Sequence, residues 1–113
     1  MKIYHNPRCS KSRLTLQRIA DAGVEPEVIE YLKTPPMANE LDGVLKKLGL
    51  EPRELMRTKE AVYKELGRAG KELSRGDAIQ VMIENPILIE RPIVVAGNKA
   101  ILGRPPENVD ELL

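Results

Sequence analysis

The chain has 113 residues, 42% of them hydrophobic and 31% charged, which is enough for one modest core and too few for two. A net charge of +1 and the scarcity of aromatic side chains argue against nucleic acid as the main partner. No apolar run is long enough for a signal peptide or a membrane span. The single cysteine cannot form an internal disulfide, so we expect a protein of the reducing cytoplasm.

The first third of the chain predicts a strand, a helix and a second strand. A strand over residues 2–5 ends at Pro7, because proline donates no hydrogen bond to a sheet. The pattern over residues 10–22 is helical, and Gly23 suits the end of that helix. Residues 27–32 predict the second strand. This order favours a right-handed βαβ unit.

The middle of the chain predicts a helical insert at about residues 37–85. Its strongest amphipathic pattern ends at Gly49, and Pro52 suits the first turn of a short helix. Thr58 is expected to cap a helix that ends near Gly67, and Ser74 to cap a later one. The predicted helices cover residues 37–48, 52–56, 58–67 and 75–84.

The last third predicts a hairpin and a final helix. Two short strands over residues 93–96 and 99–102 flank the turn Gly97-Asn98. Pro105-Pro106 then begins a helix that runs to Leu113. The complete order is β-α-β, helical insert, β-β-α. We therefore predict one α/β domain over residues 1–113, thioredoxin-like, with a mixed four-stranded sheet and helices on both faces.

Cys9 is the residue best suited to chemistry. It follows a strand and begins a helix in HNPRCSKSR, where unpaired amide groups and the helix dipole favour a thiolate and can receive an oxyanion. A lone cysteine is often a buried apolar residue, but the flanks here are polar and cationic. His5, the only histidine, either tunes Cys9 or has a structural role. One cysteine and one histidine are too few for a zinc site.

Ser12 stands where a dithiol oxidoreductase carries its second cysteine, in the pattern C-x-x-S. The chain therefore cannot close a disulfide on itself. Any redox turnover must take its second thiol from a small thiol or a partner protein.

Three arginines stand out by their context. Arg57 ends an apolar stretch, Arg91 precedes Pro92 and the third strand, and Arg104 follows the hairpin. The last two lie at strand ends, where open α/β folds place ligands. Because the guanidinium fork suits multiply charged oxyanions, these residues and Cys9 predict a site for a tetrahedral oxyanion.

The chain resembles the glutaredoxin-dependent arsenate reductases over essentially its whole length. The resemblance rests on four motifs in the same order, HNPRCSKSR, LMR, ERPIVV and LGRPPE. The resemblance implies a nucleophile, three oxyanion ligands and two residues that favour the thiolate. The nucleophile is Cys9, and the oxyanion ligands are Arg57, Arg91 and Arg104. The residues that favour the thiolate are His5 and Arg13. It also implies that Pro92 is the cis-proline that thioredoxin-like folds carry before their third strand.

The resemblance implies that arsenate is reduced to arsenite through an adduct on Cys9. Glutathione is then the co-substrate and glutaredoxin the partner, with no bound metal or organic cofactor. Two other functions remain open. One is a glutathione-dependent thiol reductase of another substrate. The other is a redox regulator that docks on RNA polymerase, although such regulators commonly carry C-x-x-C, against which Ser12 argues.

Overall fold

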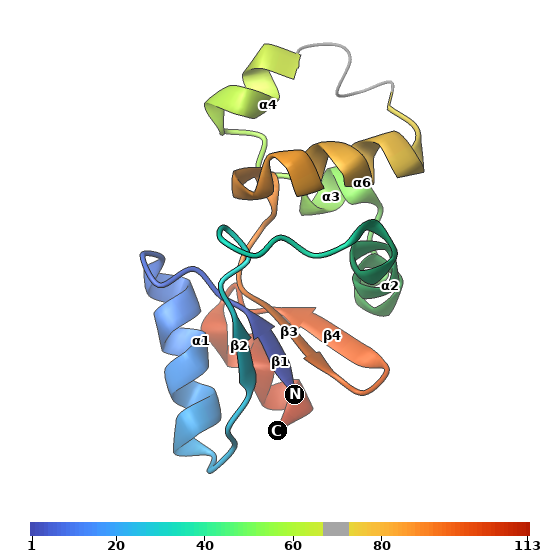
Figure 1. The fold of residues 1–113 in the computed structure, drawn as a ribbon. Helices are drawn as coiled ribbons and strands as arrows, with labels where there is room; N and C mark the ends of the chain where they lie inside the picture. The colour runs from blue at the N-terminus through green and yellow to red at the C-terminus, as the bar shows by residue number, and fades with distance from the viewer. Residues whose placement is uncertain (67–72) are drawn as a thin grey trace. The chain divides into compact units, whose positions relative to one another are not determined.

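A computed structural model describes residues 1–66 and 73–113 of the chain. The chain divides into two compact units. Figure 1 colours the chain by residue number, so the first unit contains both the blue and the red end of the scale. The first unit comprises Met1–Thr34 and Arg91–Leu113, and the second is Pro35–Glu90. Among the described residues, no helix is long and apolar enough to cross a membrane.

The first unit contains a mixed four-stranded sheet in the order β2-β1-β3-β4. Its elements are β1 (Lys2–Tyr4), α1 (Ser10–Asp21), β2 (Glu27–Ile29), β3 (Ile93–Ala96), β4 (Lys99–Leu102) and the 3₁₀ helix η2 (Pro106–Leu112). The central strand β1 is parallel to β2 and antiparallel to β3, and β3 is antiparallel to β4. This arrangement confirms the predicted mixed sheet.

The core of the first unit forms between the sheet and its two helices. Ile3 of β1 lies opposite Val94 of β3, and both side chains are fully buried. Ile19 of α1 and Val109 of η2 belong to the same buried cluster, so α1 and η2 cover one face of the sheet (Figure 1). The expectation that helices also cover the second face stays a prediction.

The second unit is helical, and its elements are α2 (Ala38–Leu48), α3 (Pro52–Leu55), α4 (Ala61–Leu66), α6 (Arg75–Glu84) and the 3₁₀ helix η1 (Pro86–Leu88). α6 packs against α2 and α3 and is joined to α2 by an ion pair of 2.7 Å between Arg75 Nε and Asp42 Oδ1. Met56, which follows α3, and Ile89, which follows η1, form an antiparallel bridge. That bridge sets the segment before α4 against the segment that leads to Arg91.

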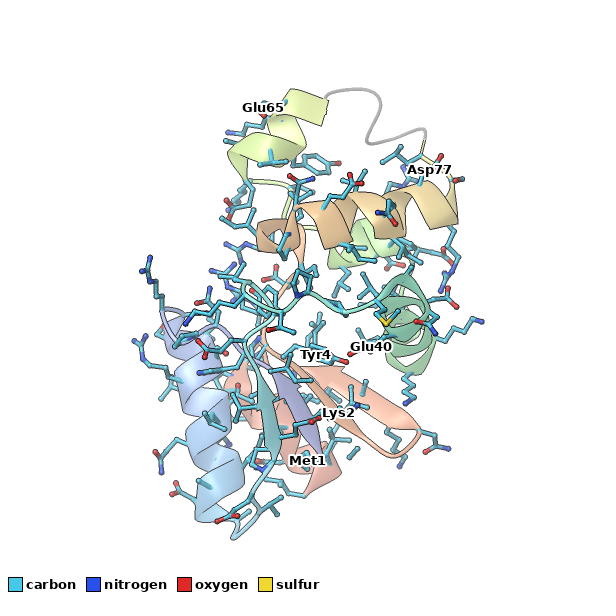
Figure 2. All side chains as sticks on the ribbon, viewed as in Figure 1. Met1, Lys2, Tyr4, Glu40, Glu65 and Asp77 are labelled. Atoms are coloured by element: carbon cyan, nitrogen blue, oxygen red, sulfur yellow. The ribbon has the colours of Figure 1, made fainter. Side chains whose placement is uncertain are left out.

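Several local predictions are confirmed. The predicted bounds of α6, β3 and β4 agree with the structure. The Asp77 N–H donates to Ser74 Oγ at 3.2 Å, as expected of a helix cap, and Asp77 lies in the first turn of α6 (Figure 2). Gly97 adopts φ +60° in the hairpin turn. The Arg91–Pro92 peptide bond is cis, as the resemblance implied, and so is Arg104–Pro105.

Other boundaries were wrong. β2 ends at Ile29 rather than near residue 32, because the N–H groups of Lys33 and Thr34 both donate to Glu30 O in a turn. Thr58 does not cap α4, which begins only at Ala61. The predicted end of that helix at Gly67 lies outside the described residues.

The last helix also differs from its prediction. It is a 3₁₀ helix over Pro106–Leu112 and stops one residue before the end of the chain. The number of independently folding domains stays a prediction.

Gly103 allows three elements of the first unit to meet closely. A Cβ at this position would lie 2.7 Å from the Pro92 ring and closer still to the Thr15 hydroxyl. Thr15 is fully buried and its hydroxyl donates to Lys11 O at 2.8 Å, so it cannot easily move. We predict that Gly103→Ala lowers the free energy of unfolding by roughly 1–3 kcal/mol, the range expected of overpacking.

Urea unfolding measures this change, with Gly43→Ala as the matched control. Nothing lies within 4 Å of the corresponding Cβ at Gly43, inside α2. The control should therefore be neutral or gain about 0.5–1 kcal/mol from helix propensity. Equal stability of the Gly103→Ala variant and the wild type would contradict the packing argument.

Candidate active site

Cys9 occupies the N-cap position of α1, at the end of a tight turn that follows β1. Its backbone is extended (φ −93°, ψ 122°), and its N–H donates to Asn6 O at 3.0 Å. Its carbonyl accepts the first helical hydrogen bond, from the Arg13 N–H at 3.0 Å. The turn and the helix together fix the sulfur at the helix N-terminus, where amide groups lack intrahelical partners.

The surroundings of the sulfur favour the thiolate. Burial by itself raises the pKa of Cys9, but the Ser12 backbone N–H, the Arg91 guanidinium and the Lys11 backbone N–H hydrogen-bond the sulfur and outweigh it. The pKa of Cys9 is therefore lower than that of an ordinary thiol. The thiol is partly exposed, so an external reactant can reach it.

Arg91 and Arg104 both lie in the first unit, at the ends of β3 and β4. Arg91 contacts the Cys9 sulfur, and Arg104 Nη1 donates to Arg91 O at 3.3 Å. The Asn108 side chain in turn donates to Leu102 O and Arg104 O, at 3.1 and 3.2 Å, and holds the backbone before η2. Two of the three predicted arginines are thus linked to the end of the sheet where Cys9 lies.

His5 is buried and acts on the site through Ser12. His5 Nδ1 lies 2.6 Å from Ser12 Oγ, which also accepts a hydrogen bond of 3.1 Å from the Asn6 N–H. Burial is the main cause that lowers the pKa of His5, and the charge of Arg13 adds to it, while Glu30 opposes both. A pKa below the usual value leaves His5 mostly neutral at pH 7.

Ser12 has a second role that the sequence did not reveal. Its side chain is fully buried between His5 and the turn, while its backbone N–H hydrogen-bonds the sulfur of Cys9. From the sequence, Ser12 is recognisable only as the residue in place of a second cysteine. The available signal was a polar residue on the buried face of α1, which also contains Thr15 and Ile19.

Arg13 stabilises the turn before Cys9. Its Nη1 donates to Pro7 O at 2.9 Å, so the guanidinium ties the loop to the first turn of α1. The predicted effect of Arg13 on the thiolate stays a prediction. No pairing of Arg13 with the sulfur is seen among the described contacts of Cys9.

Arg57 lies in the second unit, in a cluster with two carboxylates. Its Nε donates to Glu60 Oε1 at 3.1 Å and its Nη1 to Glu90 Oε1 at 2.8 Å. Burial opposes the charge of Arg57, but the two carboxylates raise its pKa above the usual arginine value. The predicted convergence of Arg57 with Arg91 and Arg104 on one anion stays a prediction.

The sequence did not identify Glu60 and Glu90. The Met56–Ile89 bridge brings Arg57 and Glu90 together, and the Arg57 N–H donates to Leu88 O at 2.7 Å within it. Because this pairing joins segments 33 residues apart, no local pattern could have shown it.

The mixed sheet and the cysteine at the N-terminus of α1 define a thioredoxin-like protein. The chain belongs to the ArsC family, whose model matches residues 4–112. It is 58% identical to the uncharacterized protein YfgD of Escherichia coli strain K12, an alignment that covers 100% of this chain and 96% of that protein. It is 46% identical to the arsenate reductase of Neisseria meningitidis strain MC58, over 100% and 97% of the two chains.

A solved structure of similar sequence agrees with the fold. The arsenate reductase from Vibrio cholerae is 50% identical and superposes with a TM-score of 0.94, over 99% of this chain and 96% of that one. The predicted α/β, thioredoxin-like class and the predicted family are therefore confirmed.

The buried His5 predicts a pH dependence of stability. Because burial holds its folded-state pKa below about 6.5, the value expected in the unfolded chain, the unfolded state takes up a proton first as pH falls. The free energy of unfolding of the wild type should thus decrease as the pH falls from about 7.5 to about 5.5. In His5→Gln this decrease should be much smaller. Urea unfolding at both pH values measures it, and an equal decrease in the two proteins would contradict the assignment.

Proposed function

We propose that this protein reduces arsenate to arsenite, with Cys9 as nucleophile and with glutathione and glutaredoxin as external thiol reductants. The observation that carries the proposal is the hydrogen bonding of the Cys9 sulfur by the Ser12 N–H and Arg91, which lowers the pKa of the thiol. A thiolate among cationic donors can both attack and bind an oxyanion. Membership of the ArsC family and the activity named for its relatives support the choice of arsenate.

In the first step the Cys9 thiolate attacks arsenic. An arsenic–sulfur bond forms, and one arsenate oxygen leaves as water after protonation. Arg91 and Arg104 are proposed to hold the remaining oxygens and to stabilise the charge that develops on them. Arg57 is proposed as the third ligand. Its ion pairs with Glu60 and Glu90 use two of the five guanidinium donors, so the Nη2 donors are available to an oxyanion.

The two electrons come from outside the chain. A glutathione thiol adds to the arsenic of the adduct and displaces a second oxygen as water. The glutaredoxin thiolate then attacks the glutathione sulfur, a mixed disulfide forms, and the electron pair of the broken sulfur–arsenic bond reduces As(V) to As(III). Hydrolysis releases arsenite and the free Cys9 thiol.

This scheme follows from the single cysteine. With Ser12 in place of a resolving thiol, the chain itself supplies one sulfur, and both reducing equivalents come from external thiols. The scheme needs no bound metal or organic cofactor. It needs reduced glutathione, which is why we place the protein in the cytoplasm.

A coupled assay with arsenate, glutathione and glutaredoxin tests the proposal. Cys9→Ser should lose turnover by at least about a thousandfold, because no other residue can form the adduct. Arg91→Lys keeps the charge and loses the fork, so kcat/KM for arsenate should fall roughly tenfold or more, the loss of about one charge-assisted hydrogen bond.

Arg53→Lys is the matched control, since Arg53 is an exposed residue of α3. It should leave kcat/KM unchanged. Absence of arsenate turnover in the folded wild type with every thiol donor tried would refute the proposal.

A further inference from the structure

A cavity of about 300 Å³ lies beside the turn that carries Cys9, within the first unit. One wall is the turn itself, and the other is the segment that follows β2. The lining residues are His5, Asn6, Pro7, Arg8, Glu30, Leu32 and Lys33. This volume is at the lower end of the range for small-molecule sites.

The topology of the sheet explains where the cavity lies. β1 and β2 are parallel, and the His5 N–H donates to Ile29 O at 2.8 Å as the last backbone contact between them. Beyond that hydrogen bond the two segments separate, one towards Cys9 and the other into the turn at Glu30. The cavity therefore occupies the carboxyl end of a parallel pair, the usual position of ligands in open α/β sheets.

The charges around the cavity form a distinct pattern. Arg8 and Lys33 are cations, and Glu30 is the one carboxylate among the lining residues. Lys33 Nζ lies 3.7 Å from Glu30 Oε1, and both side chains are substantially exposed, so this pair is loose and open to exchange with a ligand. Leu32 is 40% exposed and adds an apolar side chain to the lining of the cavity.

We propose that this cavity binds the external thiol co-substrate, a small peptide thiol with two carboxylates and one ammonium group. The two carboxylates of the ligand are complementary to Arg8 and Lys33, and its ammonium group is complementary to Glu30. Arg8 immediately precedes Cys9 in the chain, so a ligand bound there lies against the turn that carries the nucleophile. This inference rests on the proposed function, because it assigns a place to the thiol that the proposed reaction requires.

A binding experiment tests the site without turnover. S-methylglutathione, which cannot exchange thiols, is titrated into the Cys9→Ser protein and followed by amide NMR shifts. Saturable shifts are expected in the amide signals of His5, Asn6 and Arg8 and of residues 30–33. Lys33→Glu should weaken binding at least fivefold, and so should the dimethyl ester of the probe, which lacks both carboxylates. Shifts confined to other residues would overturn the inference. So would an affinity that neither Lys33→Glu nor esterification of the probe changes.

The matched control is Lys99→Glu, an exposed lysine on β4, at the opposite edge of the sheet from β2. It makes the same charge change and should bind the probe as the parent does. Equal weakening by Lys99→Glu would indicate a general charge effect and refute the site.

Turnover separates this inference from the proposed function. In the coupled assay Lys33→Glu should raise KM for glutathione at least fivefold while KM for arsenate stays unchanged. An unchanged KM for glutathione in an enzyme that reduces arsenate would refute the cavity alone. If the wild type reduces no arsenate, the proposed function fails, and the titration still decides whether the cavity binds the peptide thiol.

Discussion

The unpaired amide groups at the start of α1 are the constraint on which the site depends. Every helix begins with N–H groups that have no intrahelical acceptor, and here those of Lys11 and Ser12 donate to the sulfur of Cys9. Burial alone would keep the thiol protonated, so the balance relies on these amides and on the Arg91 guanidinium. The positions of the cysteine, the turn before it and the strand that leads to it all serve this contact.

The polar contacts behind Cys9 hold that geometry in place. Ser12 links His5 and the Asn6 N–H through its buried hydroxyl, and Arg13 ties the loop at Pro7 to α1. Because these groups are buried or anchored, each one that loses its partner costs free energy, and the turn has little freedom to relax. The parallel pair β1 and β2 ends beside the same turn, so the cavity proposed for the thiol and the nucleophile share one loop.

Local patterns predicted most of the fold, because caps, hairpin turns and helical spacing are encoded within a few residues. The cap at Ser74 and the turn at Gly97 are examples. The early end of β2 depends on a turn around Glu30 that the β-rich composition of residues 27–32 conceals. Arg57 was recognised from its context, but its carboxylate partners were not, since Glu90 reaches it across a bridge between distant segments. Cys9 was recognisable because helix start, charge and motif coincide at one residue.

The reactivity of Cys9 depends on the stabilisation of its thiolate by the α1 amides and Arg91. The most direct test is the rate of Cys9 alkylation as a function of pH, in the folded wild type, in the wild type unfolded in urea, and in Arg91→Ala. We expect the lowest midpoint in the folded wild type and a higher one in Arg91→Ala. A folded wild-type midpoint equal to that of the unfolded chain would contradict it.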